Sequence, residues 1–282
     1  DAYIAWAWKA GGAPSAYGKK KIDGVESTID STNDYNNLKA HNDSSYGMKQ
    51  SINTTGGFSI TKFSLGGTSG YGWFKHGFSG DPDMVIIRRI DDTYNWDVWH
   101  SGLTTSWNTN QTLRLNTSDS LVSGRGNIFR DGSGGGFPKN DGKIHIDRGA
   151  IYGGDADDEF ICYAWKAVSG VSAFGSYTGN GTSSSPGTQT ITTAGPDGNT
   201  FKPRFVMIKP YTANGSWSMW DTHRTFASGD LSELYANGSG AESTSVTSTY
   251  LLSLENTGFK FTNIYHQSLN SSSVSYIYMA FA

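Results

Sequence analysis

The sequence predicts an all-β protein made of two tandem, related β-sandwich domains of a jelly-roll-like type. Glycine provides 36 of the 282 residues and aromatic residues 13%, whereas charged residues reach only 17%. This mixture supplies strands and tight turns but few of the residues that long helices need. Bulky side chains also alternate with small ones in several short segments, which is the period of a strand packed on both faces. Several of these segments occur twice in one order, which indicates a tandem duplication.

The repeated segments keep nearly one spacing. "DMVIIRR" at 83–89 aligns with "RFVMIKP" at 204–210, and "WDVWH" at 96–100 aligns with "WSMWD" at 217–221, each about 121 residues apart. Upstream, "ITKFSLGG" aligns with "FGSYTGN" about 114 residues later. Loop insertions and deletions between the two copies explain why the spacing changes from about 121 to about 114 residues. We therefore predict a strand at each of these anchors.

One further segment closes each predicted repeat and also opens the chain. "EFICYAW" at 159–165 and "SYIYMAF" at 275–281 alternate large and small residues, and "YIAWAW" at 3–8 does the same. A strand with exposed tryptophans and no neighbour is unfavourable in water. We therefore expect this opening strand to pack against another sheet. The large side chains expected to be buried there are Ile4, Trp6 and Trp8.

The predicted organisation has four parts. They are a terminal strand of the repeat type (1–11), a linker or insert (12–56), the first β-sandwich repeat (57–166) and the second (167–282). The second part is polar and rich in turn residues, and the second repeat has no counterpart of it. It is either a linker that crosses a domain or subunit boundary, or a small hairpin around "KKKIDGVEST".

Composition and charge argue against several classes of partner. The net charge is −3 and the cationic residues are scattered except for Lys19 to Lys21, so we expect no nucleic-acid partner. No apolar run approaches the roughly 20 residues of a membrane helix, and we expect no membrane partner. Cys162 is the only cysteine, which excludes a disulfide within the chain. Because the chain starts on Asp1 rather than methionine, we expect it to be a piece of a longer polypeptide.

An acidic cluster is the main candidate metal site, and Asp131 and Asp141 of the glycine-rich loop are weaker candidates. Asp155, Asp157 and Asp158 stand in "GGDADDEF" just before a predicted strand. Oxygen ligands at alternate positions can hold Ca²⁺, but this spacing departs from the EF-hand loop and from the glycine-rich calcium repeat. The alternative interpretation is a solvated loop that leads into a strand, and we expect no other cofactor.

Tryptophans of the repeated W-x-x-W segments are candidates for a glycan site or an interface. Residues three apart in a strand point to opposite faces, so one tryptophan of each pair is expected in the core and the other on an exterior or a subunit interface. An exposed ring beside polar groups can stack on a sugar. The candidates are Trp99, Trp220, His100, Asp221, Trp73 and Trp107. Structural packing and oligomer contact are the alternatives for all six.

No catalytic motif is found. Asp221, His223 and Ser228 are the residue types of a hydrolytic triad, but no nucleophile elbow precedes them. The matching position of the first repeat is His100, so the acid is not repeated. We therefore expect the chain not to be an enzyme.

The chain resembles a tandem repeat domain of unknown function found in structural proteins of marine phages and prophages, often labelled as tail fibre or capsid-associated. The resemblance rests on "YIAWAWKAGG", "GFSITKF", "DMVIIRR…WDVWH", "EFICYAWKAVSGVSAFGSYTGNGT", "FKPRFVMIK…WSMWDTHR", "ANGSGAE", "LENTGFKF" and "YIYMAFA". It covers nearly all of the chain except 12–56 and parts of 119–150. In the first repeat "FSLGGTSG" replaces "SYTGNGTS", which puts any contact shared by that loop in doubt. The resemblance brings no catalytic residues.

The resemblance implies a virion or fibre component of a larger polypeptide that contacts a host. Together with the tryptophan candidates, it leads us to expect a module that acts in assembly and in host attachment, including by glycan binding. By analogy with fibre proteins we expect a homo-oligomer, specifically a trimer, that also contacts other virion proteins. The expected location is the virion or the extracellular space. Two alternatives remain: a fibre-borne carbohydrate-active enzyme such as a polysaccharide depolymerase, and a non-viral extracellular filament subunit.

Overall fold

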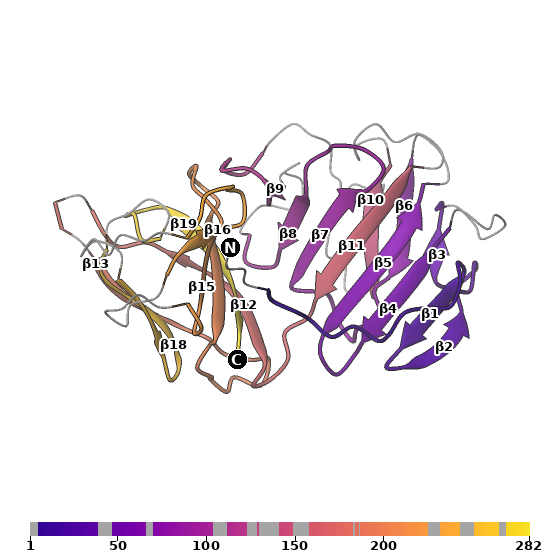
Figure 1. The fold of residues 1–282 in the computed structure, drawn as a ribbon, viewed down its shortest axis with the longest axis horizontal. Helices are drawn as coiled ribbons and strands as arrows, with labels where there is room; N and C mark the ends of the chain where they lie inside the picture. Colours follow the sequence, from indigo (N-terminus) through magenta and orange to yellow (C-terminus); the bar gives the residue numbers. More distant parts are fainter. Residues whose placement is uncertain are drawn as a thin grey trace. The chain divides into compact units, whose positions relative to one another are not determined.

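The chain is all-β, as predicted, in a computed structural model (Figure 1). The structure describes residues 5–38, 47–65, 70–103, 112–122, 129, 141–148, 158–182, 184–185, 187–224, 232–242, 251–264 and 269–282. These residues form strands β1 to β19 and no helix, so none of them lies in a helix that could span a membrane.

The described residues divide into two compact units. Unit 1 takes its described residues from 5–94, 129 and 141–166, and unit 2 takes its own from 95–103, 112–122 and 167–282. Residues of the predicted 12–56 linker thus belong to unit 1, and two stretches of the predicted first repeat are counted with unit 2. The tandem-domain boundaries stay a prediction.

The larger sheet of unit 1 is built around the closing strand of the predicted first repeat. Its strands lie in the order β2 (Val25–Thr28), β1 (Lys19–Ile22), β4 (Lys49–Asn53), β5 (Phe58–Ser64), β11 (Glu159–Trp165) and β7 (Met84–Arg89). β1 pairs with β4 in parallel, and the other pairs are antiparallel. The strand anchors at 83–89 and 159–165 are confirmed.

The hairpin interpretation of "KKKIDGVEST" is also confirmed. β1 and β2 pair antiparallel, with Ile22 opposite Val25. The two residues between them, Asp23 and Gly24, have φ of 48° and 89°, as a type I′ turn requires. Because β1 also pairs with β4, this hairpin is part of the sheet of unit 1.

Unit 1 is a sandwich because a second sheet packs on this one. The second sheet has the order β10 (Lys143–Asp147), β6 (Tyr71–Lys75) and β3 (Tyr35–Asn36). Phe63 of β5 lies 5.2 Å from Phe74 of β6 and 5.5 Å from Phe160 of β11, between ring centroids. These three rings are fully buried or nearly so and join the two layers in one core.

Unit 2 is a second two-layer sandwich. One sheet has the order β12 (Ser172–Thr178), β19 (Ser275–Phe281), β14 (Phe205–Pro210), β15 (Ser218–Asp221) and β16 (Leu234–Tyr235). The other has the order β13 (Gly187–Thr192), β18 (Gly258–Ile264) and β17 (Leu251–Glu255). Tyr177 stacks on Tyr276 at 4.8 Å and also contacts Phe259 and Phe261 of the facing sheet. Unit 2 also contains the pair β8 (Asp97–His100) and β9 (Leu113–Arg114).

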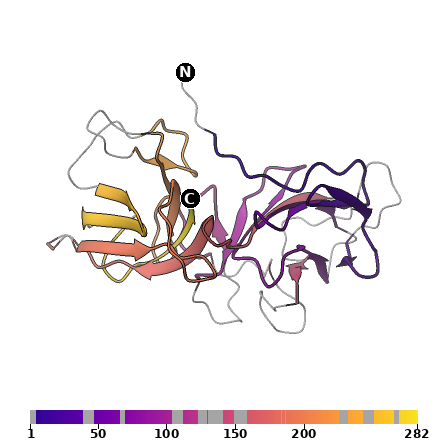
Figure 2. The ribbon, with the colours of Figure 1, turned by 90° about the horizontal axis from the view of Figure 1, so that it is seen from below.

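The opening segment differs from its prediction. Residues 5–11 form no strand, and Ile4 lies outside the described residues. The chain runs over the face of the unit 1 sheet instead of pairing with an edge (Figures 1 and 2). Trp8 is half-buried there, with its ring centroid 5.7 Å from that of Trp165 and 6.3 Å from that of Phe58. The alternating pattern therefore marked a packed segment but not a strand, because a strand also needs hydrogen bonds to a neighbour.

Several local hydrogen bonds occur twice at the spacing of the sequence anchors. Asn116 Oδ1 accepts from the Trp96 backbone N–H at 3.0 Å, and Asn237 Oδ1 accepts from the Trp217 backbone N–H at 2.8 Å. Each asparagine is the second residue after the end of a short strand, β9 or β16. Corresponding places of the predicted repeats thus have corresponding contacts.

The hydrogen bonds at the strand ends also occur at corresponding positions of the two predicted repeats. The Asp83 N–H donates to the Trp165 carbonyl at 2.7 Å, and the Arg204 N–H donates to the Phe281 carbonyl at 2.6 Å. These bonds fix the register of β7 on β11 and of β14 on β19, so the sheet registers of the two units correspond position by position.

Candidate functional site

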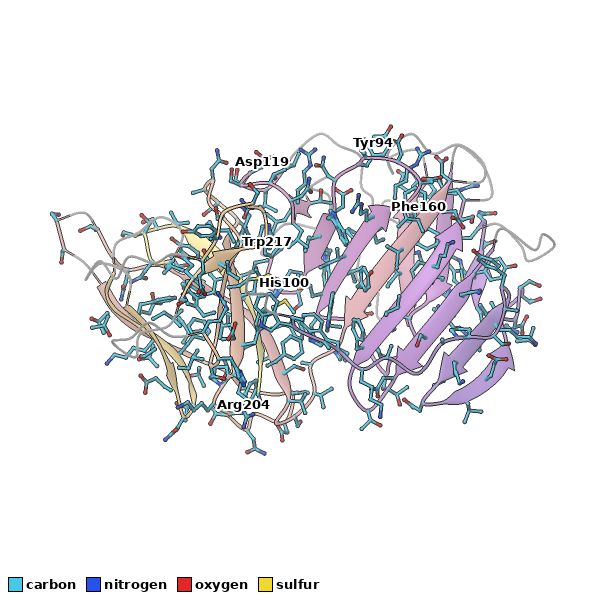
Figure 3. The ribbon with its side chains drawn as sticks, in the orientation of Figure 1. Tyr94, His100, Asp119, Phe160, Arg204 and Trp217 are labelled. Carbon is cyan, nitrogen blue, oxygen red and sulfur yellow. The ribbon has the colours of Figure 1, made fainter. Side chains whose placement is uncertain are left out.

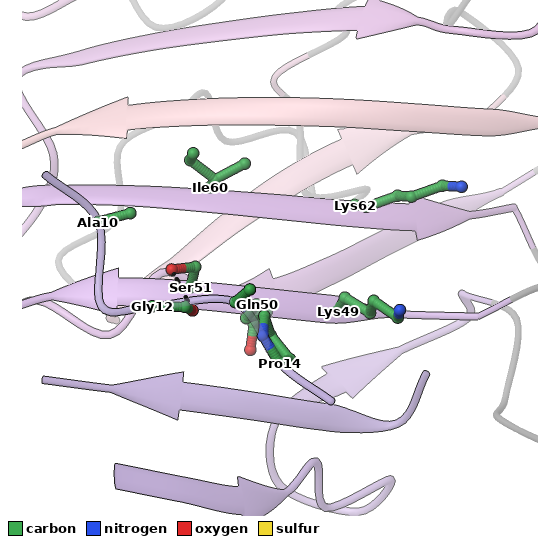
Figure 4. Close-up of a pocket in the computed structure, with 9 residues that line it drawn as sticks. Ala10, Gly12, Pro14, Lys49, Gln50, Ser51, Ile60 and Lys62 are labelled. Atoms are coloured by element: carbon green, nitrogen blue, oxygen red, sulfur yellow. Dashed lines mark hydrogen bonds between the residues drawn. The ribbon is translucent and has the colours of Figure 1, made fainter. Parts of the chain in front are cut away.

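An open groove lies on the outer face of the larger sheet of unit 1 (Figure 4). It has a volume of about 340 Å³ and runs between the opening segment of the chain and strands β4 and β5. Its lining residues are Ala10, Gly12, Ala13, Pro14, Lys49, Gln50, Ser51, Ile60 and Lys62. The walls are mostly alkyl groups, and the two lysines are the charged side chains among the described residues that line the groove.

Two side chains of β4 hold the opening segment in place as one wall of the groove. Ser51 Oγ donates to the Gly12 carbonyl at 2.7 Å, and Asn53 Nδ2 donates to the Lys9 carbonyl at 2.8 Å. A Cβ atom at Gly11 would lie 2.0 Å from the Ile52 carbonyl oxygen, so only glycine allows the segment to lie this close to the strand. The wall is therefore built by specific contacts.

The two lysines lie side by side because of the strand register. Lys49 of β4 is directly opposite Lys62 of β5, and both side chains extend toward the same end of the groove in Figure 4. Like charges directly opposite each other are unfavourable. The Tyr17 ring moderates this, since its centroid lies 4.5 Å from Lys49 Nζ and 5.3 Å from Lys62 Nζ.

Lys62 is fixed by two further partners. Its Nζ donates to Tyr17 Oη at 2.8 Å and lies 2.6 Å from Glu159 Oε1. Burial lowers the pKa of Lys62, but the hydrogen bonds to Glu159 and Tyr17 outweigh it, so that the pKa is raised overall. Lys62 therefore stays cationic at neutral pH, with its charge balanced by Glu159, so Lys49 supplies the net positive charge at this end of the groove. The groove thus combines a cationic end with an apolar wall. This arrangement suits a carboxylate attached to an apolar surface.

Three of the predicted glycan or interface residues are buried in unit 2. Trp220 is 3% exposed and belongs to the core of the sandwich. His100, labelled in Figure 3, is 1% exposed, with Nε2 3.0 Å from the Tyr278 carbonyl oxygen. Asp221 is 3% exposed and lies 2.7 Å from the Arg224 guanidinium. None of these side chains presents a surface on which a sugar could stack.

The prediction that one tryptophan of each W-x-x-W pair faces outward is wrong for the second pair. Trp217 is 1% exposed, like its buried neighbour Trp220. Trp217 Nε1 donates to the Arg114 carbonyl at 2.8 Å, because residues 112–122 lie over this part of unit 2. In the first pair Trp99 is half-buried.

Of the remaining candidate residues, Trp73, Asp141 and Asp158 lie in the described part of the chain. Trp73 is half-buried on β6, with Lys143 Nζ 4.1 Å above its ring. Asp158 is 7% exposed and pairs with Arg89 Nη2 at 2.7 Å, which makes it a structural ion pair. Trp107, Asp131, Asp155 and Asp157 lie outside the described residues. Within the described part of the chain, no three metal-ligating side chains lie together.

Sequence reasoning missed the groove because its parts come from distant segments. Tyr17 and Lys49 stand in the stretch interpreted as a linker or insert, and Lys62 stands in a predicted strand. The turn-rich "NTTGG" between Asn53 and Phe58 is the signal that could have joined β4 to β5 as a hairpin. That hairpin would have placed the two lysines on adjacent strands.

A family model described as a domain of unknown function (DUF7483) matches residues 34–282. No curated protein and no solved structure matches the chain significantly.

Proposed function

The chain belongs to the family described as a domain of unknown function (DUF7483), so we propose its function from its own residues. We propose that it is a non-catalytic module that assembles into a larger structure and attaches that structure to an acidic glycan. The lysine-flanked groove of unit 1 is the observation that carries the attachment role. It is the surface on which cationic groups, an aromatic ring and an apolar wall lie together among the residues described above.

The groove supports an acidic sugar better than a neutral one. A carboxylate at the cationic end can accept hydrogen bonds from Lys49 and Lys62, whose ammonium groups border the Tyr17 ring. The apolar face of the same sugar ring can lie on Pro14 and Ile60. Charge at an open groove also raises the rate of encounter with a polyanionic chain, and this steering weakens as salt rises.

The assembly role rests on the repeated architecture. We include in the proposal that the chain is a tandem of two related sandwiches. Its support is the recurrence of the asparagine contacts and the sheet registers at the spacing of the sequence anchors. Repeated modules with repeated contacts are a common way to build extended appendages.

The resemblance noted in the sequence makes a viral tail fibre or capsid-surface appendage the preferred setting, with a host-surface glycan as the ligand. A trimer, contacts with other virion proteins and a virion or extracellular location belong to the same proposal. The fibre-borne depolymerase and the non-viral extracellular filament subunit are the competing functions. They differ from the proposal in measurable ways: the first cleaves a glycan, and the second binds none.

Titration calorimetry with a hexuronate-containing oligosaccharide tests the attachment role. Lys49→Gln removes one cation from the groove, and Lys202→Gln makes the same change at an exposed position of unit 2. We expect Lys49→Gln to lose about tenfold in affinity, or about 1.4 kcal/mol, and Lys202→Gln to bind like the parent protein. Equal affinities of the two variants, or equal binding of a neutral oligosaccharide of the same length, would refute the groove as the site.

A further inference from the structure

A joint inside unit 2 shows how one repeat contacts the next. Residues 112–122 lie against the segment that connects β14 to β15. The Leu121 N–H donates to the Tyr211 carbonyl at 2.9 Å, and the Gly215 N–H donates to the Ser118 carbonyl at 2.8 Å. Within the tandem repeat these contacts join the middle of the first repeat to the second.

The joint is closely packed as well as hydrogen-bonded. Tyr211 is 4% exposed, Lys209 is fully buried, and Leu113 is fully buried. The Ser120 N–H also donates to Asn214 Oδ1 at 2.9 Å. Backbone and side-chain polar groups of the two segments are thus hydrogen-bonded to one another.

The first repeat has its own version of the receiving segment. Ile90 corresponds to Tyr211, since the Ile90 N–H donates to the Glu159 carbonyl at 2.9 Å just as the Tyr211 N–H donates to the Ser275 carbonyl at 2.9 Å. We call residues 88–94 the front surface. Residues 88–90 and 92 are more exposed than their counterparts, and the largest side chain shows the difference most clearly: Ile90 is 42% exposed, whereas Tyr211 is 4% exposed.

The second repeat has its own version of the donating segment. Residues 233–242, here called the back surface, correspond to 112–121. Tyr235 at the Arg114 position is 38% exposed, and Leu234 is half-buried where Leu113 is fully buried. Residues 238–242 are all exposed. Ile90 and Tyr235 are two of the four large hydrophobic side chains that are exposed in the described residues.

We propose that a second copy of this chain covers these surfaces: the back surface of one copy binds the front surface of the next, as residues 112–122 bind residues 209–215 within unit 2. The proposal rests on the tandem-repeat part of the proposed function and names its partner. The evidence for this occupant is the pair Tyr211 and Leu113, which are buried where a neighbouring repeat exists, whereas their counterparts Ile90 and Leu234 are exposed and half-buried where none does. Residues 238–242 are likewise all exposed, whereas most of their counterparts at 117–121 are half-buried.

Such a contact joins two different surfaces, so it is head-to-tail. A head-to-tail contact leaves one front and one back surface uncovered in every open assembly, and it yields either a closed ring or a linear chain of copies. A ring of three copies would agree with the trimer expected by analogy.

Complementary variants test the proposal by light-scattering mass measurement after size exclusion, without any glycan. Ile90→Lys places a charge in the front surface, and Ala241→Arg places a bulky charge in the back surface, at the position of Ser120. Both positions are exposed, so circular dichroism should show both variants folded. Val171→Lys, at a position that is 44% exposed, is the matched control.

We expect the mass of the parent protein and of the control to rise with concentration, and each of the two variants alone to remain a monomer. An equimolar mixture of the two should form a species of two copies and nothing larger, because one intact front and one intact back surface remain. A monomeric parent, association of either variant alone, a monomeric control, or a mixture without a two-copy species would each overturn the proposal. The Lys49→Gln binding result is independent of all of these outcomes.

Discussion

Acidification should destabilise unit 2 through His100. The ring is 1% exposed, with Nε2 3.0 Å from the Tyr278 carbonyl oxygen, and the Gly102 N–H donates to Nδ1 at 2.9 Å. Only the neutral tautomer with hydrogen on Nε2 satisfies both contacts, since a proton on Nδ1 would face the Gly102 N–H. Burial lowers the pKa of His100 from 6.5 to about 4, and the hydrogen bond to the Tyr278 carbonyl offsets this only in part.

The sign and size of the effect follow from linkage. Between the folded pKa and 6.5 the unfolded chain binds the proton that the folded chain does not, so stability falls as pH falls. For a pKa that changes from 6.5 to about 4, the loss is about 1.4 kcal/mol at pH 5.5 and about 2.5 kcal/mol at pH 4.5. Burial also lowers the pKa of His76 in unit 1 to about 4, more than the nearby Asp141 carboxylate raises it. The whole chain should therefore lose about 5 kcal/mol at pH 4.5.

Urea unfolding at pH 7.5, 5.5 and 4.5, followed by tryptophan fluorescence, measures this loss. His100→Gln lowers stability at pH 7.5 but should lose only about half as much as the parent protein on acidification. His223→Gln, at an exposed position of the same unit, should keep the pH dependence of the parent. If His100→Gln and the parent lose equal stability between pH 7.5 and 4.5, the buried neutral imidazole is not the cause.

Three substitutions test the local geometry by the same urea assay. Gly258→Ala should lower the free energy of unfolding by about 3 kcal/mol or more, because the new Cβ would lie 2.0 Å from the Ile191 carbonyl oxygen. A decrease below about 1 kcal/mol would contradict this packing. Gly24→Ala should lower the free energy of unfolding by only about 1–2 kcal/mol, since φ is 89° but nothing lies within 4 Å of the new Cβ. A decrease as large as that of Gly258→Ala would contradict the open surroundings of Gly24. Asn237→Ala should cost about 1–3 kcal/mol, because it leaves the backbone N–H of the buried Trp217 unpaired; an unchanged stability would argue against the repeated asparagine contact.

Much of the strand content could be predicted because similar strand-like segments occur twice in the sequence in one order. The anchors at 83–89, 159–165, 204–210 and 275–281 became β7, β11, β14 and β19. Two independent copies of each pattern reinforce one another, whereas one copy of an alternating segment is ambiguous. The opening segment shows that ambiguity, because its alternation reflects packing of Trp8 on the sheet and no strand forms.

The features that could not be predicted depend on contacts between segments that are far apart in the sequence. β1 and β4 pair in parallel although they come from separate segments of the chain, and no sequence pattern specifies which strands of different segments become neighbours. Burial of Trp217 was also missed, because residues 112–122 that cover it are about 100 positions away in the chain. The groove depends on such register, as Lys49 and Lys62 are neighbours only after β4 pairs with β5.

A combined binding and cleavage assay decides whether the chain binds an acidic polysaccharide without cleaving it. The protein is incubated with a soluble polysaccharide rich in hexuronic acid, and bound polysaccharide and new reducing ends are measured in the same samples. We expect saturable binding that falls with salt and with Lys49→Gln, and no increase in reducing ends over a heat-inactivated control. New reducing ends that accumulate with time and enzyme concentration would contradict this expectation and identify a depolymerase.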